Sequence, residues 1–176
     1  MLHKTKIAKL LLTLYTFGII IWIGGSIIRT SIAFELYVPA TKLTLKTEYS
    51  DAIRLQNVKL YAYSALYTDV AFGAAALAII LLVIYWSKNV KKYGWLFMSL
   101  ILFVLSVPYE AFQIYLDIKL NYAIQSGLKV FDCPEISNYF VARFAKFSIW
   151  GAMSFLTSLT SIVVLIWRPL DKYANK

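Results

Sequence analysis

Residues 74–83 read AAALAIILLV, an unbroken run without a polar side chain. This run lies within one of four long apolar stretches, which together occupy most of the 176-residue chain: Ile7–Phe34, Leu60–Ser87, Trp95–Leu116 and Phe147–Trp167. A helix of about 20 apolar residues is long enough to cross the hydrocarbon core of a bilayer. The sequence therefore predicts an all-α polytopic membrane protein, an antiparallel bundle of four transmembrane helices in a single domain over residues 1–176.

Composition and charge agree with this prediction. Hydrophobic residues make up 60% of the chain, and the mean hydropathy is +0.67, whereas soluble domains average about 45–50% apolar residues. The net charge of +9 comes from lysines and arginines, many of them in the short chain ends and the short 88–94 connector, where Asp171 is the sole acid. Basic residues in short segments mark the cytoplasmic side. We therefore expect both termini inside, a multi-pass protein of the cell (plasma) membrane, the lipid bilayer as surroundings and no nucleic-acid partner.

The boundaries of the helices follow from the ends of the apolar runs. We expect helices over about residues 7–34, 51–87, 95–120 and 143–168, with outer loops over about 35–50 and 121–142. Pro108 removes one backbone hydrogen bond and predicts a kink in the third helix. Small residues let helices approach closely in lipid, which predicts helix packing at five glycines: Gly18, Gly24, Gly25, Gly73 and Gly151.

Ionisable side chains inside a span are costly, and they are candidates for a functional site. The predicted spans contain Arg29, Asp69, Glu110 and Asp117, and Arg143 opens the fourth helix. At about 1.5 Å per residue, Asp69 and Glu110 fall at similar depth in the outer half of the membrane, and all four helices offer charge to this layer. The inner half carries only scattered hydroxyls. The sequence thus predicts an outer polar layer above an apolar plug, without a continuous ion path.

Two interpretations of this layer remain open. In the first, Arg29 pairs with Glu110 or Asp69, and the layer is a structural ion-pair network. In the second, the layer forms a ligand vestibule or an interface with a partner. On either interpretation we expect Glu110→Gln to be tolerated less well than Asp117→Asn.

Reactive chemistry is poorly represented in the chain. His3 is the sole histidine and Cys133 the sole cysteine, which excludes a bis-histidine haem, a histidine-rich copper site and a thiolate cluster within one chain. The sequence has no glycine-rich phosphate loop and no Ser/His/Asp set. We therefore predict no catalytic residue, no metal site and no cofactor, although Asp69 and Glu110 together leave carboxylate-only metal binding conceivable. The aromatic content of 16% leaves stacking on a quinone or pigment open.

The first helix contains Tyr15, Gly18, Trp22, Gly24 and Gly25 in the order Tyr-x-x-Gly-x-x-x-Trp-x-Gly-Gly. This segment resembles the His-x-x-Gly-x-x-x-Trp-x-Gly-Gly opening helix of small four-helix membrane proteins related to the CopD copper-resistance family. The resemblance implies a compact antiparallel four-helix bundle. Tyr15 stands where those proteins carry histidine, so a metal or haem role is not carried over.

Three functions remain open after these observations. The first is a non-catalytic subunit that packs within a larger membrane protein complex. The second is a small transporter, channel or ligand-binding protein that uses the outer polar layer, either alone or as a homo-oligomer. The third is a membrane enzyme, in which Asp69 and Glu110 would act alone as acid and base; this is the least favoured of the three.

Overall fold

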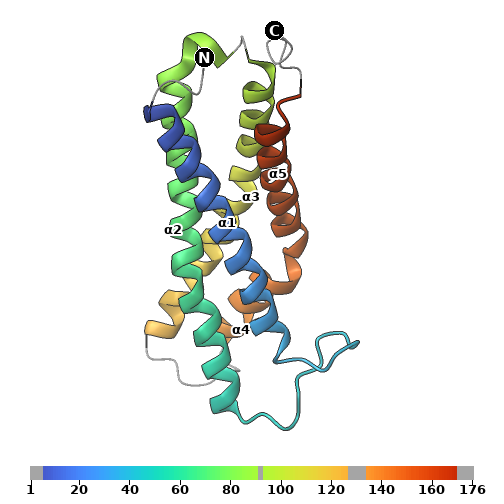
Figure 1. Cartoon of the computed structure of the whole chain (residues 1–176). Coiled ribbons are helices and arrows are strands. Elements are labelled where there is room, and N and C mark those ends of the chain that lie inside the picture. Colours follow the sequence, from blue (N-terminus) through green and yellow to red (C-terminus); the bar gives the residue numbers. More distant parts are fainter. Residues whose placement is uncertain (1–5, 91–92, 127–133, 170–176) are drawn as a thin grey trace.

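The computed structural model describes residues 6–90, 93–126 and 134–169, without the side chains of residues 86–90. The helices are α1 (Lys6–Phe34), α2 (Asp51–Val90), α3 (Gly94–Gln125), α4 (Pro134–Val141), the π-helical turn η2 (Ala142–Lys146) and α5 (Ser148–Trp167) (Figure 1). Within the described ranges the only β-type pairing is an isolated bridge between Tyr37 and Leu45. The prediction of an all-helical protein is confirmed. The predictions made from His3 and Cys133 concern positions outside the described residues.

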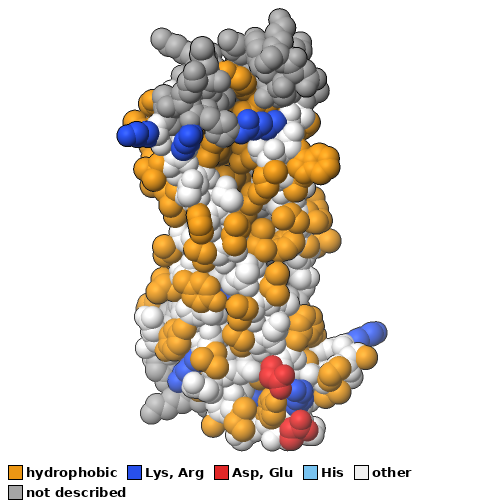
Figure 2. Space-filling model, viewed as in Figure 1, with side chains coloured by type: hydrophobic (Ala, Val, Ile, Leu, Met, Phe, Trp, Pro, Cys, Tyr) orange, Lys and Arg blue, Asp and Glu red, His pale blue; other side chains and the backbone are white. Residues whose placement is uncertain are grey.

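Four of the helices are long and apolar enough to cross a membrane: Lys6–Phe34, Asp51–Tyr85, Gly94–Gln125 and Ser148–Trp167. Figure 2 shows charged side chains near the two ends of the molecule and a zone of hydrophobic and uncharged side chains between them. Most of the large side chains exposed along the four helices are apolar. An apolar surface of this extent requires lipid around it, so the chain is a multi-pass membrane protein.

Contacts between the helices give their relative directions. Gly18 of α1 lies against Ala71 and Ala75 of α2, whereas Gly25, further along α1, lies against Thr68. Later positions of α1 therefore contact earlier positions of α2. The start of α1 and the end of α5 share one end of the molecule, and the 35–50 connection and α4 lie at the opposite end (Figure 1). We call this second end the α4 end.

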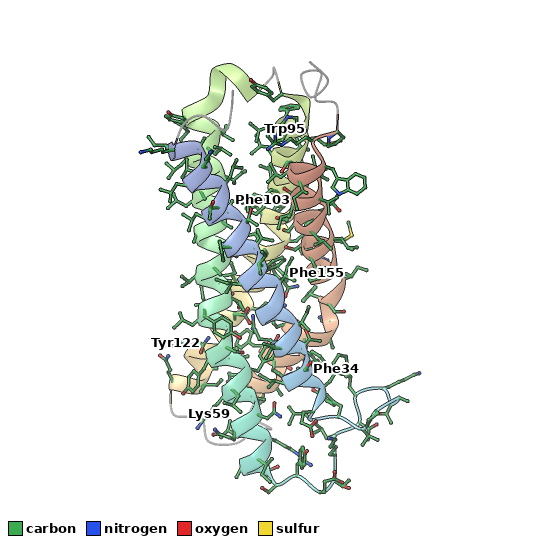
Figure 3. The ribbon with its side chains drawn as sticks, in the orientation of Figure 1. Phe34, Lys59, Trp95, Phe103, Tyr122 and Phe155 are labelled. Carbon is green, nitrogen blue, oxygen red and sulfur yellow. The ribbon has the colours of Figure 1, made fainter. Side chains whose placement is uncertain are left out.

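Across the centre of the molecule, α1 and α3 meet at a repeated spacing. The rings of Tyr15 and Phe103 are 5.3 Å apart between centroids, Trp22 bonds to Glu110, and Arg29 bonds to Asp117. Each pair is 88 residues apart, and each step along either helix is seven residues. Side chains that repeat every seven residues keep one face of a helix turned toward a partner. This register brings the polar residues of α1 and α3 together (Phe103 is labelled in Figure 3).

Two apolar clusters enclose the polar residues. The first lies toward the start of α1 and includes Tyr15, Ile19, Phe72 and Phe103. The second lies at the α4 end, where Ile136 and Phe140 of α4 cover residues of α1, α2 and α3. Arg29, Thr68, Glu110, Gln113 and Asp117 occupy the positions between these clusters, whereas Ser99 lies within the first cluster.

The structure corrects the predicted start of the fourth membrane helix. We expected one helix over residues 143–168, but α5 begins at Ser148, and Phe147 interrupts the helix with φ −111° and ψ 22°. The Phe147 N–H bonds to the carbonyl of Ala142, five residues earlier, as in a π-helix. The Phe147 carbonyl accepts a hydrogen bond from Gln113 Nε2 at 2.8 Å. Gln113 therefore stabilises the break from the neighbouring helix.

The other bounds differ less from the predicted ones. Helix α2 extends to Val90, and α3 extends to Gln125 and passes through Pro108 without interruption. Within the predicted 35–50 loop, the chain turns tightly, and Val38 N–H bonds to the Thr44 carbonyl and Lys46 N–H to the Leu36 carbonyl. Helix α4 lies within the region predicted as the 121–142 loop.

The five predicted packing glycines differ in their surroundings. A Cβ atom on Gly18 would lie 2.7 Å from the Ala71 carbonyl oxygen, and one on Gly25 would overlap Thr68, so both allow α1 and α2 to touch. A Cβ atom on Gly24 or Gly73 would have no atom within 4 Å. Gly24 and Gly73 therefore face away from the neighbouring helices of the described chain, and their packing role stays a prediction. Gly151 lies beside two polar side chains of the candidate site.

Candidate functional site

Asp117 lies between two arginines inside the protein. Arg29 Nη2 donates to Asp117 Oδ1 at 2.5 Å, and Arg143 Nε donates to Asp117 Oδ2 at 3.1 Å. The side chains of Arg29 and Asp117 are only 2% and 1% exposed. Arg29 also donates to Thr68 at 3.3 Å and lies over the ring of Tyr61, 4.5 Å from its centroid. Buried charges require such pairing.

This arrangement corrects the partner that we expected for Arg29. The sequence suggested Glu110 or Asp69, but Arg29 pairs with Asp117. The reason is the register of α1 against α3: Glu110 lies seven residues before Asp117, about 10 Å away along the helix, at the level of Trp22. Trp22 Nε1 donates to Glu110 Oε1 at 2.7 Å, a contact that the sequence analysis missed.

Asp69 does not join these residues. It is half-buried on α2, and its Oδ1 atom is buried without a hydrogen-bond partner in the described part of the chain. Asp69 is also absent from the walls of the cavity beside Glu110 and Arg143. Of the five residues predicted as one layer, Arg29, Glu110 and Arg143 line the cavity and Asp117 pairs with both arginines, whereas Asp69 lies outside the cavity lining.

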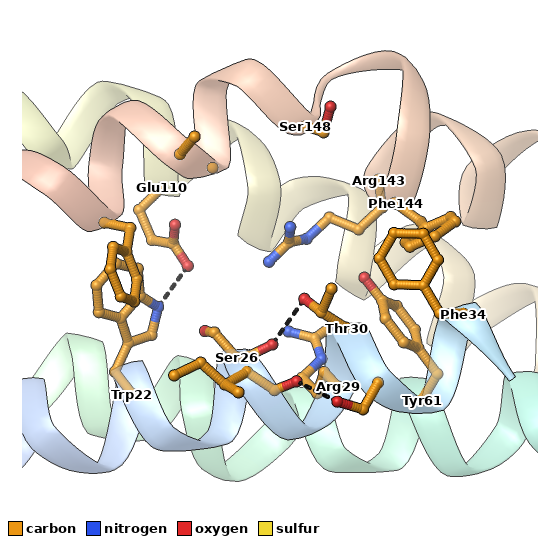
Figure 4. A pocket seen from close by; sticks show the side chains of 15 residues that line it. Trp22, Ser26, Arg29, Thr30, Phe34, Tyr61, Glu110, Arg143, Phe144 and Ser148 are labelled. Atoms are coloured by element: carbon orange, nitrogen blue, oxygen red, sulfur yellow. Dashed lines mark hydrogen bonds between the residues drawn. The ribbon is translucent and has the colours of Figure 1, made fainter. Parts of the chain in front are cut away.

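A cavity of about 490 Å³ lies between α1 and α5 at the level of these charges (Figure 4). Its polar lining contains both arginines, Glu110 and several hydroxyl groups, and its apolar lining is mainly aromatic. The lining residues are Trp22, Ser26, Ile27, Arg29, Thr30, Ser31, Phe34, Tyr61, Glu110, Arg143, Phe144, Ser148, Gly151, Ala152 and Phe155. Ile27 and Phe34 are more than half exposed, so the cavity opens sideways between the two helices.

Local backbone features place Arg143 at this cavity. Arg143 belongs to η2, and the break at Phe147 separates this turn from α5. Short π-helical segments occur frequently at functional sites. Gly151 carries no side chain, and a Cβ there would lie 3.8 Å from Arg143 Nη1 and 3.9 Å from Gln113 Nε2. The glycine thus leaves space beside the guanidinium.

Several polar atoms at the cavity lack partners among the described residues. Arg143 uses Nε for Asp117, and neither Nη1 nor Nη2 has a hydrogen bond within the described ranges. Arg29 Nε is buried and also unpartnered. Glu110 receives the Trp22 hydrogen bond on Oε1, which leaves Oε2 for another donor. The cavity thus offers free donors from Arg143 and a free acceptor from Glu110.

The other half of the bundle is closed. Tyr15 Oη lies 2.7 Å from Ser161 Oγ, which lies 2.8 Å from Ser99 Oγ, and all three residues are buried. These hydroxyls satisfy one another between α1, α3 and α5. No group of three His, Cys, Asp or Glu side chains that could hold a metal ion occurs in the part of the chain that the structure describes.

Comparison with protein-family models, curated proteins and solved structures finds no match to this chain. The resemblance of the first helix to CopD-related proteins therefore stays a prediction. In the structure, Tyr15, at the position of the family's histidine, is fully buried and bonded to Ser161.

Proposed function

We propose that this protein binds an amphipathic, lipid-like molecule in the cavity between α1 and α5. One observation supports this function above the alternatives: a cavity with a charged floor and aromatic walls opens sideways between two membrane-spanning helices. Its volume lies within the range of about 300–1,000 Å³ that small-molecule sites occupy. A ligand that enters from the bilayer would place its polar head on the charges and its apolar part against the aromatic rings.

The proposed topology is an antiparallel four-helix bundle in the plasma membrane, with both termini in the cytoplasm. Lys6 and Lys9 at the start of α1 and Arg168 after α5 lie at one end of the molecule, and basic residues near short segments favour the cytoplasmic side. The α4 end then faces outward. On this topology, the cavity opens into the outer leaflet.

A ligand-binding function is favoured over transport of a solute across the membrane. Between the cavity and the cytoplasmic end, the apolar cluster around Tyr15, Ile19 and Phe103 fills the bundle. The hydroxyls of Tyr15, Ser99 and Ser161 bond to one another, so they do not provide a series of free polar groups along which an ion could pass. A transporter of this fold would need a second arrangement of the helices.

Filling the cavity tests this function. The Gly151→Leu variant adds a side chain beside Arg143, and Ala111→Leu adds one at an exposed position of α3 outside the cavity. Native mass spectrometry of the protein extracted in mild detergent would show co-purified lipid on the unmodified protein and on Ala111→Leu. We expect Gly151→Leu to lose it. Equal lipid occupancy of all three proteins, or none on any, would contradict the proposal.

A second candidate is the role of a non-catalytic subunit in a larger membrane complex, and Asp69 favours it. The exposed residues Leu66, Val70, Gly73 and Leu77 follow one another at spacings of four, three and four, the seam of a helix that packs on another helix. Asp69 adjoins this seam and is only half-buried, so part of its carboxylate group can be reached from outside. A partner helix carrying a lysine, arginine or other donor would satisfy it.

A second copy of this chain fits that surface less well, because it would bring two Asp69 carboxylates together. Gentle extraction followed by native gels and mass spectrometry would identify what co-migrates. We expect Asp69→Asn to lose a stoichiometric partner that the exposed variant Glu48→Gln retains. A lone, lipid-bearing species in both variants would remove this candidate and leave the ligand-binding function.

A further inference from the structure

We infer that the molecule held in this cavity carries a zwitterionic head in which a phosphate lies beside a primary ammonium group, attached to an apolar chain. The inference rests on the proposed ligand-binding function and specifies its ligand class. It follows from the free polar atoms of two facing side chains, Arg143 and Glu110, and from the charge balance around them.

Arg143 provides the site for the phosphate. Its Nε atom is held by Asp117 at 3.1 Å, which fixes the plane of the guanidinium. Its two terminal nitrogens extend into the cavity (Figure 4) and have no hydrogen bond within the described residues. A guanidinium edge with two parallel N–H groups matches phosphate or carboxylate oxygens. Ser148 lines the same cavity and supplies a hydroxyl donor, whereas the Thr30 hydroxyl already donates to the Ser26 carbonyl.

Glu110 provides the site for the ammonium group. It projects from α3 toward the cavity, and Arg143 projects toward the same space from η2 (Figure 4). Among the described residues, the two side chains form no ion pair within 4.0 Å; Arg143 pairs with Asp117 instead. Trp22 fixes one oxygen of Glu110, and the other is available to an N–H donor. A head that fits between the two side chains would bond to both.

Charge balance selects a zwitterion over a simple anion. Two arginines, Arg29 and Arg143, share the carboxylate of Asp117, and the carboxylate of Glu110 balances the second positive charge. A simple anion would pair with Arg143 and lie near an uncompensated carboxylate, and burying such a charge is costly. A phosphate beside an ammonium group compensates both side chains.

The apolar part of the ligand follows from the cavity's opening. Ile27, Phe34 and Phe155 contribute apolar walls toward the gap between α1 and α5 (Phe34 and Phe155 are labelled in Figure 3). An acyl or alkyl chain would leave the cavity through this gap into the bilayer. The same head without a chain would lose these contacts.

The test measures which head groups bind. The unmodified protein in detergent is titrated by native mass spectrometry with palmitoyl lysophosphatidylethanolamine, palmitoyl lysophosphatidylcholine, palmitoyl lysophosphatidate and chainless phosphoethanolamine. We expect the ethanolamine lipid to bind about tenfold more tightly than the other two lipids. The choline head cannot donate a hydrogen bond to Glu110, and the phosphatidate head lacks a cation. Chainless phosphoethanolamine should bind most weakly.

Variants assign the contacts. Glu110→Gln and Arg143→Gln should each weaken binding of the ethanolamine lipid by about ten- to a hundredfold, and Glu110→Gln should also remove the preference over choline. The exposed variants Glu48→Gln and Lys146→Gln are matched controls and should bind within about twofold of the unmodified protein. Head-group selectivity of the unmodified protein remains a valid test if Arg143→Gln fails to fold.

The outcomes separate the two proposals. Equal binding of all three lipids, with Gly151→Leu still abolishing it, would overturn the zwitterionic head and retain the ligand-binding function. Phosphatidate binding as tightly as the ethanolamine lipid would overturn the ammonium site. If chainless phosphoethanolamine binds as tightly as the ethanolamine lipid, the proposal that the ligand is a lipid would be overturned. No binding by any probe, together with no effect of Gly151→Leu, would overturn both proposals.

Discussion

Replacing Asp117 by asparagine should be the most destabilising single-atom change in the polar cluster. The carboxylate accepts hydrogen bonds from Arg29 at 2.5 Å and Arg143 at 3.1 Å, and its side chain is 1% exposed, so solvent does not screen either contact. Breaking a buried ion pair by removing one partner costs about 3–5 kcal/mol. Asparagine keeps one oxygen acceptor, but it leaves two buried guanidiniums without a counter-ion.

The matched substitution at Glu110 should cost much less. Trp22 donates to one oxygen of Glu110, and the amide oxygen of glutamine can accept the same hydrogen bond. Glu110 has no arginine partner within 4.0 Å among the described residues. The substitution Glu110→Gln therefore does not leave a buried cation without its counter-ion. We expect a loss of about 1 kcal/mol. This order reverses the expectation from the sequence, in which Glu110 was the more sensitive position.

Thermal unfolding in detergent, followed by the loss of the monodisperse peak on size-exclusion chromatography, measures this difference. At about 2–4 °C per kcal/mol for a chain of this size, Asp117→Asn should lower the midpoint by about 6–20 °C and Glu110→Gln by about 2–4 °C. The control Asp51→Asn, whose side chain is 58% exposed beside Arg54, should change little. A midpoint for Glu110→Gln at or below that of Asp117→Asn would refute the reasoning.

Three further predictions follow from close contacts elsewhere. Gly25→Ala should destabilise the protein by about 1–3 kcal/mol, because the new methyl group would overlap α2. Gly73→Ala should stay within about 0.5 kcal/mol; thermal midpoints in detergent compare the two. Tyr15→Phe should lose about 1 kcal/mol in the same assay, since it removes one hydrogen bond of the buried hydroxyl cluster, and an unchanged midpoint would contradict that cluster's role. In the 35–50 connection, hydrogen bonds from Lys46 and Tyr49 hold the pKa of Glu35 below its ordinary value. The stability from this contact is therefore present at neutral pH and is lost as pH falls through the lowered pKa. Tyr49→Phe should move the opening of the loop to higher pH, measured by hydrogen exchange corrected for intrinsic rates; opening at the same pH would contradict it.

The membrane spans could be predicted because they depend on composition over long windows. Each span needs only enough consecutive apolar residues, and no tertiary contact alters that requirement. The interruption at Phe147 could not be predicted in the same way. It depends on Gln113 of α3, which donates a hydrogen bond to the Phe147 carbonyl. The local sequence over residues 142–148 contains neither proline nor glycine.

The composition of the candidate site was predicted better than its pairing. An ionisable residue inside a span is unusual, so Arg29, Glu110 and Asp117 were identified from the sequence. Depth estimates of about 1.5 Å per residue cannot distinguish positions one or two turns apart, and they carry no information about helix rotation. The seven-residue register between α1 and α3 determines both the relative depth and the relative rotation of these helices. It pairs Trp22 with Glu110 and Arg29 with Asp117.

The same register divides the residues of the polar layer between the structural and the functional interpretation. Arg29 and Asp117 are paired with each other and enclosed between two apolar clusters, as a structural ion pair should be. Glu110 and Arg143 line a cavity and retain free hydrogen-bonding atoms toward it. Asp117 links the two roles, because it holds Arg29 with one oxygen and orients Arg143 with the other. An Asp117 variant that still folds should therefore lose ligand affinity as well as stability, whereas loss of stability alone would assign the whole cluster to structure.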